Sequence, residues 1–435
     1  MKRYTVSIVI PTHNRSASLI RLLTALSKQT YPLEEIEVIV VANGCTDRTT
    51  EILKQIQTPF TLKIIEQSDQ GPAGARNNGA GRAEGRFLIF LDDDVEPSSS
   101  LVESFVAAHT CSPGKIAIGY LHPNMDGKRD FISKELRRWW EDQFNAMREP
   151  GHRFSYHEML SGNFSIEYEK FRQLGGFDTK FRACLDDSEF GFRLLKSGAS
   201  FVFIENAKGD HHENRNLRGM YVRKYNEGQA EVLLAQKHPE LRPVLTLSRF
   251  QGYSIILYRL ILTFAFYLSR IGDIASETLH KLLFILEWLR LRRPWRTILN
   301  ILMIYWYMRG VADKLGSKKA YLNLLNEDFF QEEDESVIEI DLAQGFAGAE
   351  QRIDEERPKG LKLRYGKHEI GTLNQFPEME YLRGDHLRPI LAKYFQIQIL
   401  KALASEGLVE EKFGKARLIE FGGGFLPADL GEDKE

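Results

Sequence analysis

The chain has 435 residues, of which 43% are hydrophobic, so it is long enough to bury the cores of more than one domain. Its 58 basic and 60 acidic residues nearly balance and give no reason to expect nucleic acid as a partner. Its cysteines, Cys45, Cys111 and Cys184, are too few and too scattered for a disulfide framework and lack the spacing of a metal site.

The first predicted strand is VSIVIP, at residues 6–11, and the apolar run around it is too short for a signal peptide. We therefore expect a reduced, cytoplasmic setting. Similar apolar, β-branched runs lie at 36–41, 61–65 and 86–91, with helical patterns such as SASLIRLLTALSKQ between them. Strands that are apolar on both faces and alternate with helices predict a parallel α/β sheet.

Polar residues follow each of these predicted strands. They lie at 12–14, 43–47, 67–70 and 92–94. Ligands of open α/β sheets bind beyond the carboxyl ends of the strands, so we expect a site here.

The fourth strand ends in three carboxylates, in the stretch FLIFLDDDVEP. Side-chain alternation sends Asp92 and Asp94 to the same side. Two carboxylates suit a hard divalent cation, because Mg²⁺ and Mn²⁺ take one or two of them and complete their shell with phosphate oxygens and water. One alternative is a solvated loop. Another is a haloacid-dehalogenase-like phosphatase, but its Asp-x-Asp pattern normally follows the first strand rather than the fourth.

A second carboxylate pair stands at the start of a helical pattern, CLDDSEFGFRLLKSG. Leu185, Phe190 and Leu194 share an apolar face, and Gly198 ends the pattern. Asp186 and Asp187 therefore lie at the helix N-terminus, where they either cap the helix or serve a reaction.

Residues 241–325 differ in composition from the N-terminal part. The runs at 253–268, 279–293 and 298–308 are rich in Leu, Ile and aromatic residues, and basic residues outnumber acidic ones. Arg259 interrupts the first run, and the other two are too short to span a bilayer. Either amphipathic basic helices lie on a membrane surface, or ordinary helices pack on the N-terminal domain or on the second subunit of a homodimer.

An acidic stretch, NEDFFQEEDESVIEID, follows and is interpreted as a linker. Strand-like and helix-like patterns after it predict a small α/β module. The expected division is therefore a domain at 1–240, a helical segment at 241–325, and the linker with its accessory module at 326–435.

Six motifs in a fixed order resemble family 2 glycosyltransferases with the GT-A fold. They are VSIVIPTHNR, VVANGCTDRT, GPAGARNNGA, FLDDDVEP, SGNFSIEYEKFRQLGGFD and LDDSEFGFRLLKSG, and the resemblance covers residues 5 to about 215. It implies a Rossmann-like, mostly parallel sheet flanked by helices. It also implies inverting, metal-assisted transfer of a sugar from a nucleotide-diphosphate sugar to a hydroxyl of a polysaccharide, glycolipid or lipid-linked saccharide.

The resemblance assigns the nucleotide side of the site by position. Its expected residues are Pro11, Thr12, His13 and Asn43 near the base, Arg76 at the nucleotide, Asp92 at the ribose and Asp93 beside it. Asn43 stands where the family often has an acid that accepts the uracil N3 proton. Its amide oxygen can accept a hydrogen bond but carries no charge. The resemblance makes UDP the expected nucleotide, and this departure from the family's pattern leaves GDP and dTDP as alternatives.

The resemblance also implies the catalytic residues. Asp94 and His212, from GDHHENRN, would hold Mn²⁺ or Mg²⁺, and Asp187 would be the catalytic base. The residues expected on the acceptor side are Gly162, Asn163 and Asp186. Trp139 and Trp140 either stack on an acceptor sugar or pack in the core.

An alternative function uses the same fold to bind a ligand without catalysing a reaction. The chain would then be a noncatalytic nucleotide-sugar- or carbohydrate-binding protein at a membrane surface. The presence of both Asp94 and Asp187 argues against it. We therefore expect a cytoplasmic glycosyltransferase, peripheral on the inner face of a membrane.

Overall fold

The structure is a computed structural model. It describes residues 4–125, 127–128, 130–212, 216–249, 255–326, 336–374 and 376–408. The chain divides into two compact units, the first made of Met1–Arg148, Phe154–Gln331 and Pro377–Glu380, and the second of Glu149–Arg153, Glu332–Phe376 and Tyr381–Glu435.

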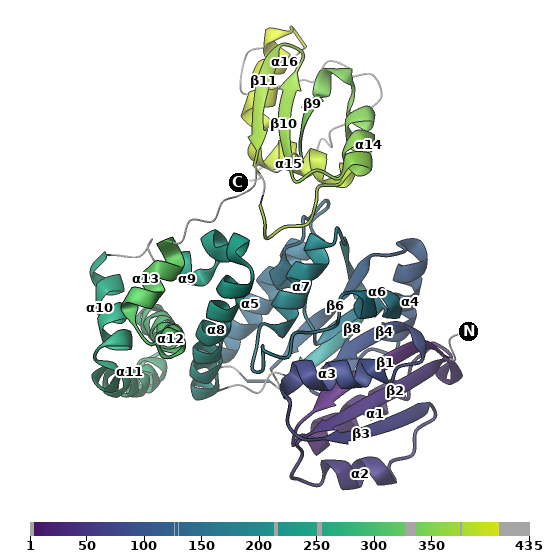
Figure 1. Ribbon diagram of the computed structural model, residues 1–435, viewed down its shortest axis with the longest axis vertical. Coiled ribbons are helices and arrows are strands. Elements are labelled where there is room, and N and C mark those ends of the chain that lie inside the picture. The colour runs from purple at the N-terminus through teal and green to yellow at the C-terminus, as the bar shows by residue number, and fades with distance from the viewer. Residues whose placement is uncertain are drawn as a thin grey trace. The chain divides into compact units, whose positions relative to one another are not determined.

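The first unit is built on one mixed sheet (Figure 1). Its described strands are β1 (Tyr4–Thr12), β2 (Ile36–Asn43), β3 (Thr61–Gln67), β4 (Gly85–Leu91), β5 (Val95–Pro97), β6 (Ile116–Asn124), β7 (Asn163–Glu167) and β8 (Phe201–His212). They lie in the order β3-β2-β1-β4-β7-β6-β8-β5. Strands β1 to β4 run parallel, β7 is antiparallel to both β4 and β6, and β5 is antiparallel to β8.

Helices cover both faces of this sheet, which explains why its central strands are apolar throughout. Every residue of β2 is buried. The helices are α1 (Ser16–Leu26), α2 (Thr49–Gln55), α3 (Gly71–Gly81), α4 (Leu101–Cys111), α5 (Phe131–Arg148), α6 (Tyr168–Gln173) and α7 (Asp186–Lys196). Short 3-10 helices lie at Leu33–Glu35, Tyr156–Glu158 and Pro239–Val244. The expected mostly parallel α/β sheet flanked by helices is confirmed.

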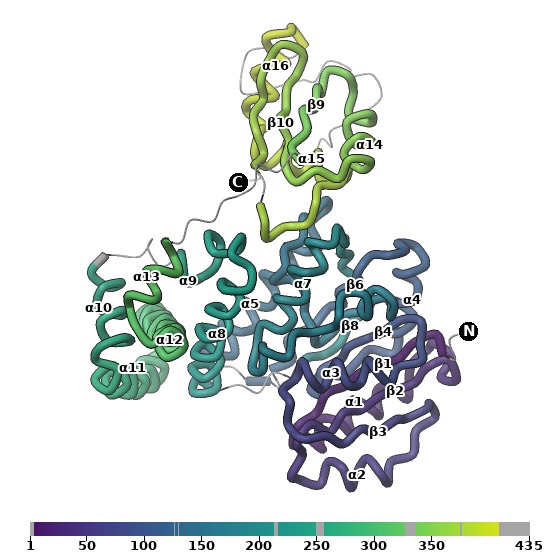
Figure 2. Tube along the Cα trace, in the orientation of Figure 1, coloured from purple at the N-terminus to yellow at the C-terminus, as the bar shows by residue number. Residues whose placement is uncertain are grey.

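The helical segment packs within the first unit, on the side of α8 away from the sheet (Figure 2). Helix α8 (Leu217–Lys237) precedes the segment, whose helices are α9 (Thr246–Arg249), α10 (Ile255–Phe266), α11 (Ser269–Trp288), α12 (Arg292–Leu315) and α13 (Lys318–Asn326). Helices α8 and α12 cross closely, because a Cβ on Gly228 would meet the Tyr307 carbonyl and a Cβ on Gly310 would meet that of Tyr225. Across the described residues, we find no helix with both the length and the apolar character needed to cross a membrane.

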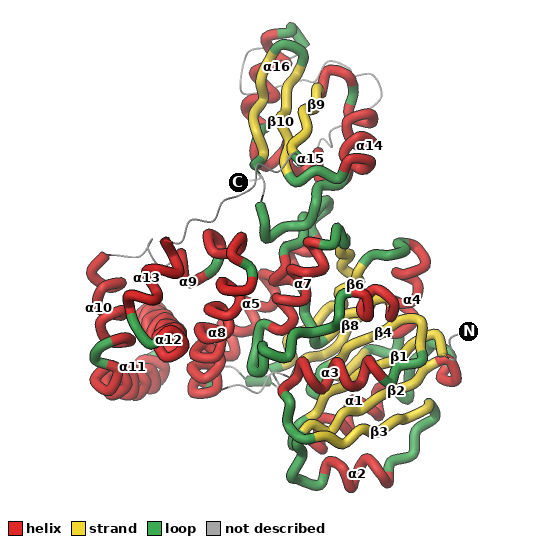
Figure 3. Tube along the Cα trace, in the orientation of Figure 1, coloured by secondary structure: helices red, strands yellow, loops and turns green. Residues whose placement is uncertain are grey.

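The described part of the second unit contains a sheet of order β11-β10-β9 and its own core (Figure 3). Its elements are β9 (Val337–Asp341), α14 (Phe346–Glu356), β10 (Gly360–Tyr365), β11 (His368–Leu373), α15 (Leu387–Tyr394) and α16 (Gln396–Ser405), with short 3-10 helices at Leu342–Gln344 and Gly384–His386. The predicted small C-terminal α/β module is confirmed.

Candidate functional site

Arg76 joins the two acidic motifs that the sequence singled out. It projects from α3 and its side chain is buried. Its Nη2 donates to Asp92 Oδ1 at 2.6 Å, and its Nη1 donates to Asp186 Oδ2 at 2.8 Å. The Arg76 charge opposes the repulsion among these carboxylates, so the turn after β4 and the start of α7 are held together by one guanidinium.

Asp93 is buried between two donors from the end of β1. Thr12 Oγ1 donates to it at 2.7 Å, and Arg15 Nη1 donates to it at 3.0 Å and to Asp94 at 2.7 Å. Burial raises the pKa of Asp93 to about 6, although Arg15 and Thr12 oppose the shift. Sequence analysis missed Arg15, whose signal was its place at the end of VSIVIPTHNR, directly after the first strand.

The Asp94 carboxylate faces a histidine on β8. Asp94 Oδ1 is buried and has no hydrogen-bond partner among the described residues, and His211 Nε2 lies 3.6 Å from it. His212 points to the other side of the strand, where its Nε2 lies 3.1 Å from Glu96 Oε2. The structure therefore brings His211, rather than the expected His212, to Asp94.

This pair suits the metal that the family implies. No three His, Cys, Asp or Glu side chains within the described ranges form a ready-made metal cluster. A buried, unpaired carboxylate oxygen of Asp94 beside the His211 imidazole still supplies two donors that Mn²⁺ accepts. A cation that takes its other ligands from substrate phosphates and water needs few from the protein.

Asn43 is held by its own neighbours on the nucleotide side. Its Nδ2 donates to Asp69 Oδ1 at 2.9 Å. Its Oδ1 accepts from Gln67 Nε2 at 2.8 Å and from the Gln70 backbone N–H at 2.9 Å. The amide thus fixes the turn between β3 and α3, and beside it Asp69 presents an exposed carboxylate that sequence analysis missed.

The other expected nucleotide residues end β1. Pro11 and Thr12 are its last residues, and Thr12 turns its hydroxyl to Asp93. The Nδ1 of His13 lies 2.7 Å from the Asn43 carbonyl oxygen. The ends of β1 and β2 are therefore adjacent, as the parallel pairing of these strands requires.

Asp186 and Asp187 open α7 after Leu185, which has a left-handed backbone with a φ of 61°. Asp187 Oδ1 accepts the Ser188 N–H at 2.8 Å. Burial raises the pKa of Asp186 to about 7 against the pull of Arg76, and burial also raises the pKa of Asp187. A carboxylate with a raised pKa is a better proton acceptor, which suits Asp187 to general-base chemistry.

Gly162 and Asn163 have different surroundings. The Gly162 carbonyl accepts the Asp92 N–H at 3.2 Å, and a Cβ at Gly162 would lie 2.8 Å from Asp92 Oδ2. Asn163 is fully buried, and its Nδ2 donates to the carbonyls of Tyr120 and Ala207 at 3.3 and 2.9 Å. Gly162 thus borders the carboxylate cluster, whereas Asn163 ties β7 to β6 and β8 inside the sheet.

The two tryptophans of α5 are separated by burial. Trp140 is buried and meets the His211 ring edge-on, with centroids 5.4 Å apart. Trp139 is 45% exposed. Trp140 therefore packs in the core beside the histidine that faces Asp94, and core packing is one of the two alternatives that the sequence left open.

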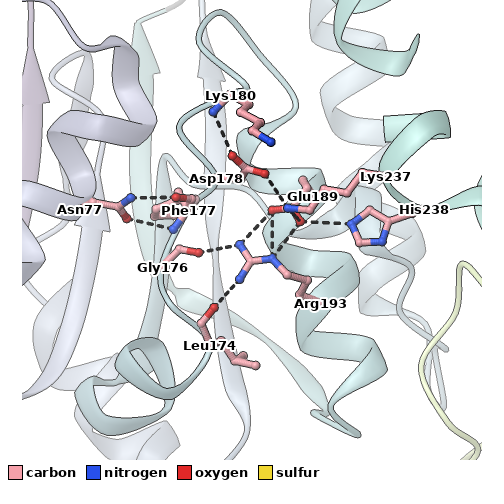
Figure 4. A network of polar contacts seen from close by, with 10 residues as sticks. All are labelled: Asn77, Leu174, Gly176, Phe177, Asp178, Lys180, Glu189, Arg193, Lys237 and His238. Carbon is pink, nitrogen blue, oxygen red and sulfur yellow. Dashed lines mark hydrogen bonds and ion pairs between the residues drawn. The ribbon is translucent and has the colours of Figure 1, made fainter. Parts of the chain in front are cut away.

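A buried ionic network positions α7 (Figure 4). The Glu189 side chain is fully buried and pairs with Arg193 Nε at 2.8 Å, Lys237 Nζ at 2.8 Å and His238 Nε2 at 3.1 Å. Burial opposes its ionisation, but hydrogen bonds from His238, Arg193 and Lys237 hold the pKa of Glu189 at about 2. Lys237 and His238 lie too far along the chain for sequence analysis to connect them with α7.

The same network reaches α3 through the loop before α7. Arg193 also donates to the carbonyls of Leu174 and Gly176. Asn77, next to Arg76, exchanges two hydrogen bonds with the backbone of Phe177, at 2.7 and 2.9 Å. The loop therefore keeps the helix of Arg76 and the helix of Asp187 in fixed register.

Comparisons with known proteins relate the chain to glycosyltransferases. Residues 7–175 match the family model described as Glycosyl transferase family 2, and residues 142–215 match one described as N-terminal domain of galactosyltransferase. Validoxylamine A glucosyltransferase of Streptomyces hygroscopicus subsp. jinggangensis is 30% identical over 270 residues, which is 55% of this chain and 62% of that protein. Glycosyltransferase AglE of Haloferax volcanii is 40% identical over 104 residues, which is 23% of this chain and 34% of that protein.

The chain thus spans less than two thirds of the length of these curated relatives. Among solved structures, the mannosyltransferase PcManGT from Pyrobaculum calidifontis in complex with GDP-Man and Mn²⁺ is 18% identical, with a TM-score of 0.48. That match covers 72% of this chain and 88% of the mannosyltransferase.

Proposed function

Because residues 7–175 belong to glycosyl transferase family 2, we propose that this protein transfers a sugar from a nucleotide-diphosphate sugar to an acceptor hydroxyl with inversion. The observation that supports this best is the contact of Arg76 with both Asp92 and Asp186. This contact puts the carboxylates after β4 beside the start of α7. The carboxylates proposed to bind the donor thus lie next to the proposed base for the acceptor. Transfer of a sugar between two bound substrates requires this proximity.

Asp187 is the proposed base. Its Oδ1 already accepts a backbone N–H, so its Oδ2 takes the proton of the acceptor hydroxyl. As the acceptor oxygen bonds to the sugar carbon, the bond from that carbon to the diphosphate oxygen breaks, and one displacement inverts the carbon. A positioned base of this kind contributes roughly 10²–10⁴-fold to the rate.

Asp94 and His211 would hold the divalent cation, Mn²⁺ or Mg²⁺. When bound, the cation neutralises the charge of the departing diphosphate. The Arg15 guanidinium donates hydrogen bonds to Asp93 and Asp94 and so orients the Asp94 carboxylate.

For the donor we propose a UDP-sugar. Both polar atoms of the Asn43 amide are engaged within the turn, so the exposed carboxylate of Asp69 is the better placed acceptor for a base N–H. A saccharide, glycolipid or lipid-linked saccharide would supply the acceptor hydroxyl.

Donor turnover by wild type and variants tests this proposal. We expect one donor from a panel of UDP-, GDP- and dTDP-sugars to turn over with manganese. Asp187→Asn should lower kcat by about 10²–10⁴-fold while donor binding is kept, and Asp94→Ala should weaken donor binding. Asp142→Asn, at a side chain 71% exposed on α5, is the control and should behave as wild type.

The noncatalytic alternative predicts a different pattern. Wild type would bind a nucleotide-sugar without turning it over in the presence of any acceptor. Asp187→Asn would then leave every measured property unchanged.

A further inference from the structure

Helix α11 has two faces of opposite exposure. Its inner face buries Gly272, Ser276, His280, Leu283 and Leu286. Its outer stripe consists of Ile271, Ile274, Leu282, Ile285 and Trp288, which are 54%, 69%, 36%, 52% and 81% exposed. The members of the outer stripe recur at helical spacing on the side opposite the buried residues, with the exposed Thr278 between Ile274 and Leu282, so an apolar band faces outward.

The acidic and basic side chains of α11 differ in their partners. All its acidic side chains are engaged within the first unit: Asp273 accepts from the Tyr305 hydroxyl at 2.6 Å, Glu277 from Arg218 at 2.7 Å and Glu287 from the Phe131 N–H at 2.7 Å. Its basic side chains, Arg270 and Lys281, are exposed beside the outer stripe. Exposed basic side chains therefore border the apolar band, whereas the acidic side chains of α11 are each paired within the first unit, Asp273 and Glu277 while 41% and 44% exposed.

The positive border continues past the end of α11. Arg290 is exposed in the turn that follows Trp288, and Arg293 is exposed in the first turn of α12. On α10, which packs against α11, Ile256 is 71% exposed, and Tyr267, directly after this helix, is 67% exposed. A tryptophan beside arginines at a helix end is typical of the boundary between lipid tails and head groups.

We propose that the outer stripe of α11 binds an anionic phospholipid surface, with its apolar side chains among the acyl chains and Arg270, Lys281, Arg290 and Arg293 at the head groups. The helix lies flat, because five charged residues along it prevent a spanning arrangement. A second copy of the chain fits less well, since it would oppose one positive border with another. This inference is independent of the proposed function.

Co-sedimentation of the full chain with phospholipid vesicles tests the proposal. We expect the chain to pellet with vesicles of equal parts phosphatidylcholine and phosphatidylglycerol, to bind pure phosphatidylcholine far less, and to be released by salt. The double variant Ile274→Asp with Ile285→Asp should lower the partition coefficient about tenfold or more. Lys281→Glu, which leaves the apolar band intact, should lower it by a smaller factor.

The matched control is Ile397→Asp on α16 of the second unit, where the side chain is 60% exposed. It should bind vesicles as wild type does. Thermal unfolding of each variant shows that it is folded, as expected for substitutions of exposed side chains.

Three results would overturn the proposal. Wild type could stay in the supernatant with both vesicle compositions. The folded double variant could pellet as wild type does. Finally, wild type could fail to bind vesicles but form a dimer in analytical ultracentrifugation that the double variant does not form. That result would assign the outer stripe to a second copy of the chain.

Discussion

At the residue scale, Arg76 has the most crowded electrostatic position in the protein's candidate site. Both its terminal nitrogens are paired with carboxylates, and its Nε has no hydrogen-bond partner among the described residues. A charge taken out of water is stable only when its partners are well placed. Arg76 is therefore a structural requirement of the site, whatever contact it makes with a nucleotide.

We predict that Arg76→Met destabilises the first unit by about 3–5 kcal/mol, because it leaves Asp186 as an unpaired buried carboxylate and also removes the partner of Asp92, whose side chain is 37% exposed. Urea unfolding at neutral pH measures this free energy. Arg15→Met is the comparison, because Arg15 has a side chain 53% exposed. Its ion pairs should contribute about 0–1 kcal/mol. If the two variants lowered the free energy of unfolding equally, burial would not be the reason that the Arg76 ion pairs stabilise the first unit.

His211 and His212 form a natural matched pair for the metal assignment. We predict that His211→Ala weakens Mn²⁺ binding in the presence of UDP by at least tenfold, because it removes the imidazole that faces Asp94. His212→Ala should change this affinity little, since His212 faces Glu96. Calorimetric titration of Mn²⁺ measures both. The opposite order of effects would restore the expectation from the sequence.

At the scale of elements, α7 is positioned by charges rather than by apolar contacts alone. Glu189 lies one turn after Asp186, and its partners come from α7 itself and from the end of α8. Because Arg193 also binds the loop that Asn77 holds, a disturbance at Glu189 reaches both the base and the carboxylate cluster.

We predict that Glu189→Gln lowers the free energy of unfolding by about 3–5 kcal/mol at neutral pH. The pKa of Glu189 is lowered to about 2 from an ordinary 4.5, so this stabilisation is present above pH 4.5 and is lost as the pH falls towards 2. Unfolding measured between these limits should thus depend less on pH in the variant than in wild type.

The control for this experiment is Glu169→Gln. Glu169 forms an exposed ion pair with Arg172 on α6, at 3.0 Å. We expect a change of about 0–1 kcal/mol and no altered pH dependence. If both variants followed the wild-type pH curve, the charge network would not be what stabilises α7.

At the scale of the whole molecule, the two sides of the helical segment have different surroundings. One side packs on the first unit through the crossing of α8 and α12, where Tyr307 also donates to the buried carboxylate of Glu231. The other side, on α11, leaves its apolar stripe uncovered in the described structure. A hydrophobic helix can serve packing and docking at once when its two faces differ.

Two glycines of α8 offer a test of the crossing. We predict that Gly228→Ala destabilises the first unit by about 1–3 kcal/mol, because the added Cβ would meet the Tyr307 carbonyl. Gly219→Ala lies on the same helix, where the new Cβ makes only an ordinary contact with Asn216 at 3.5 Å. It should be neutral or stabilising by up to about 1 kcal/mol. Thermal unfolding of the two variants makes the comparison.

Much of the fold follows from local pattern. The apolar runs at 36–41 and 86–91 became β2 and β4, and the periodicity after Leu185 became α7 with Asp186 and Asp187 at its start. These features depend on neighbours within one turn or one strand, which is the range over which side-chain periodicity acts. The sequence by itself thus determined the parallel core and the polar strand ends where a site can form.

Tertiary structure decided which of these polar residues meet. Pairing of β5 with β8 places Val95 opposite His211, and this register selects His211 over His212. The packing of α3 brings Arg76 to Asp186, and the turn after β3 engages the Asn43 amide. Contacts between distant segments depend on the register of the strands and on the packing of the whole chain. A shift of one residue in the register would turn each side chain of a strand to the other face of the sheet, and no local sequence pattern specifies that register.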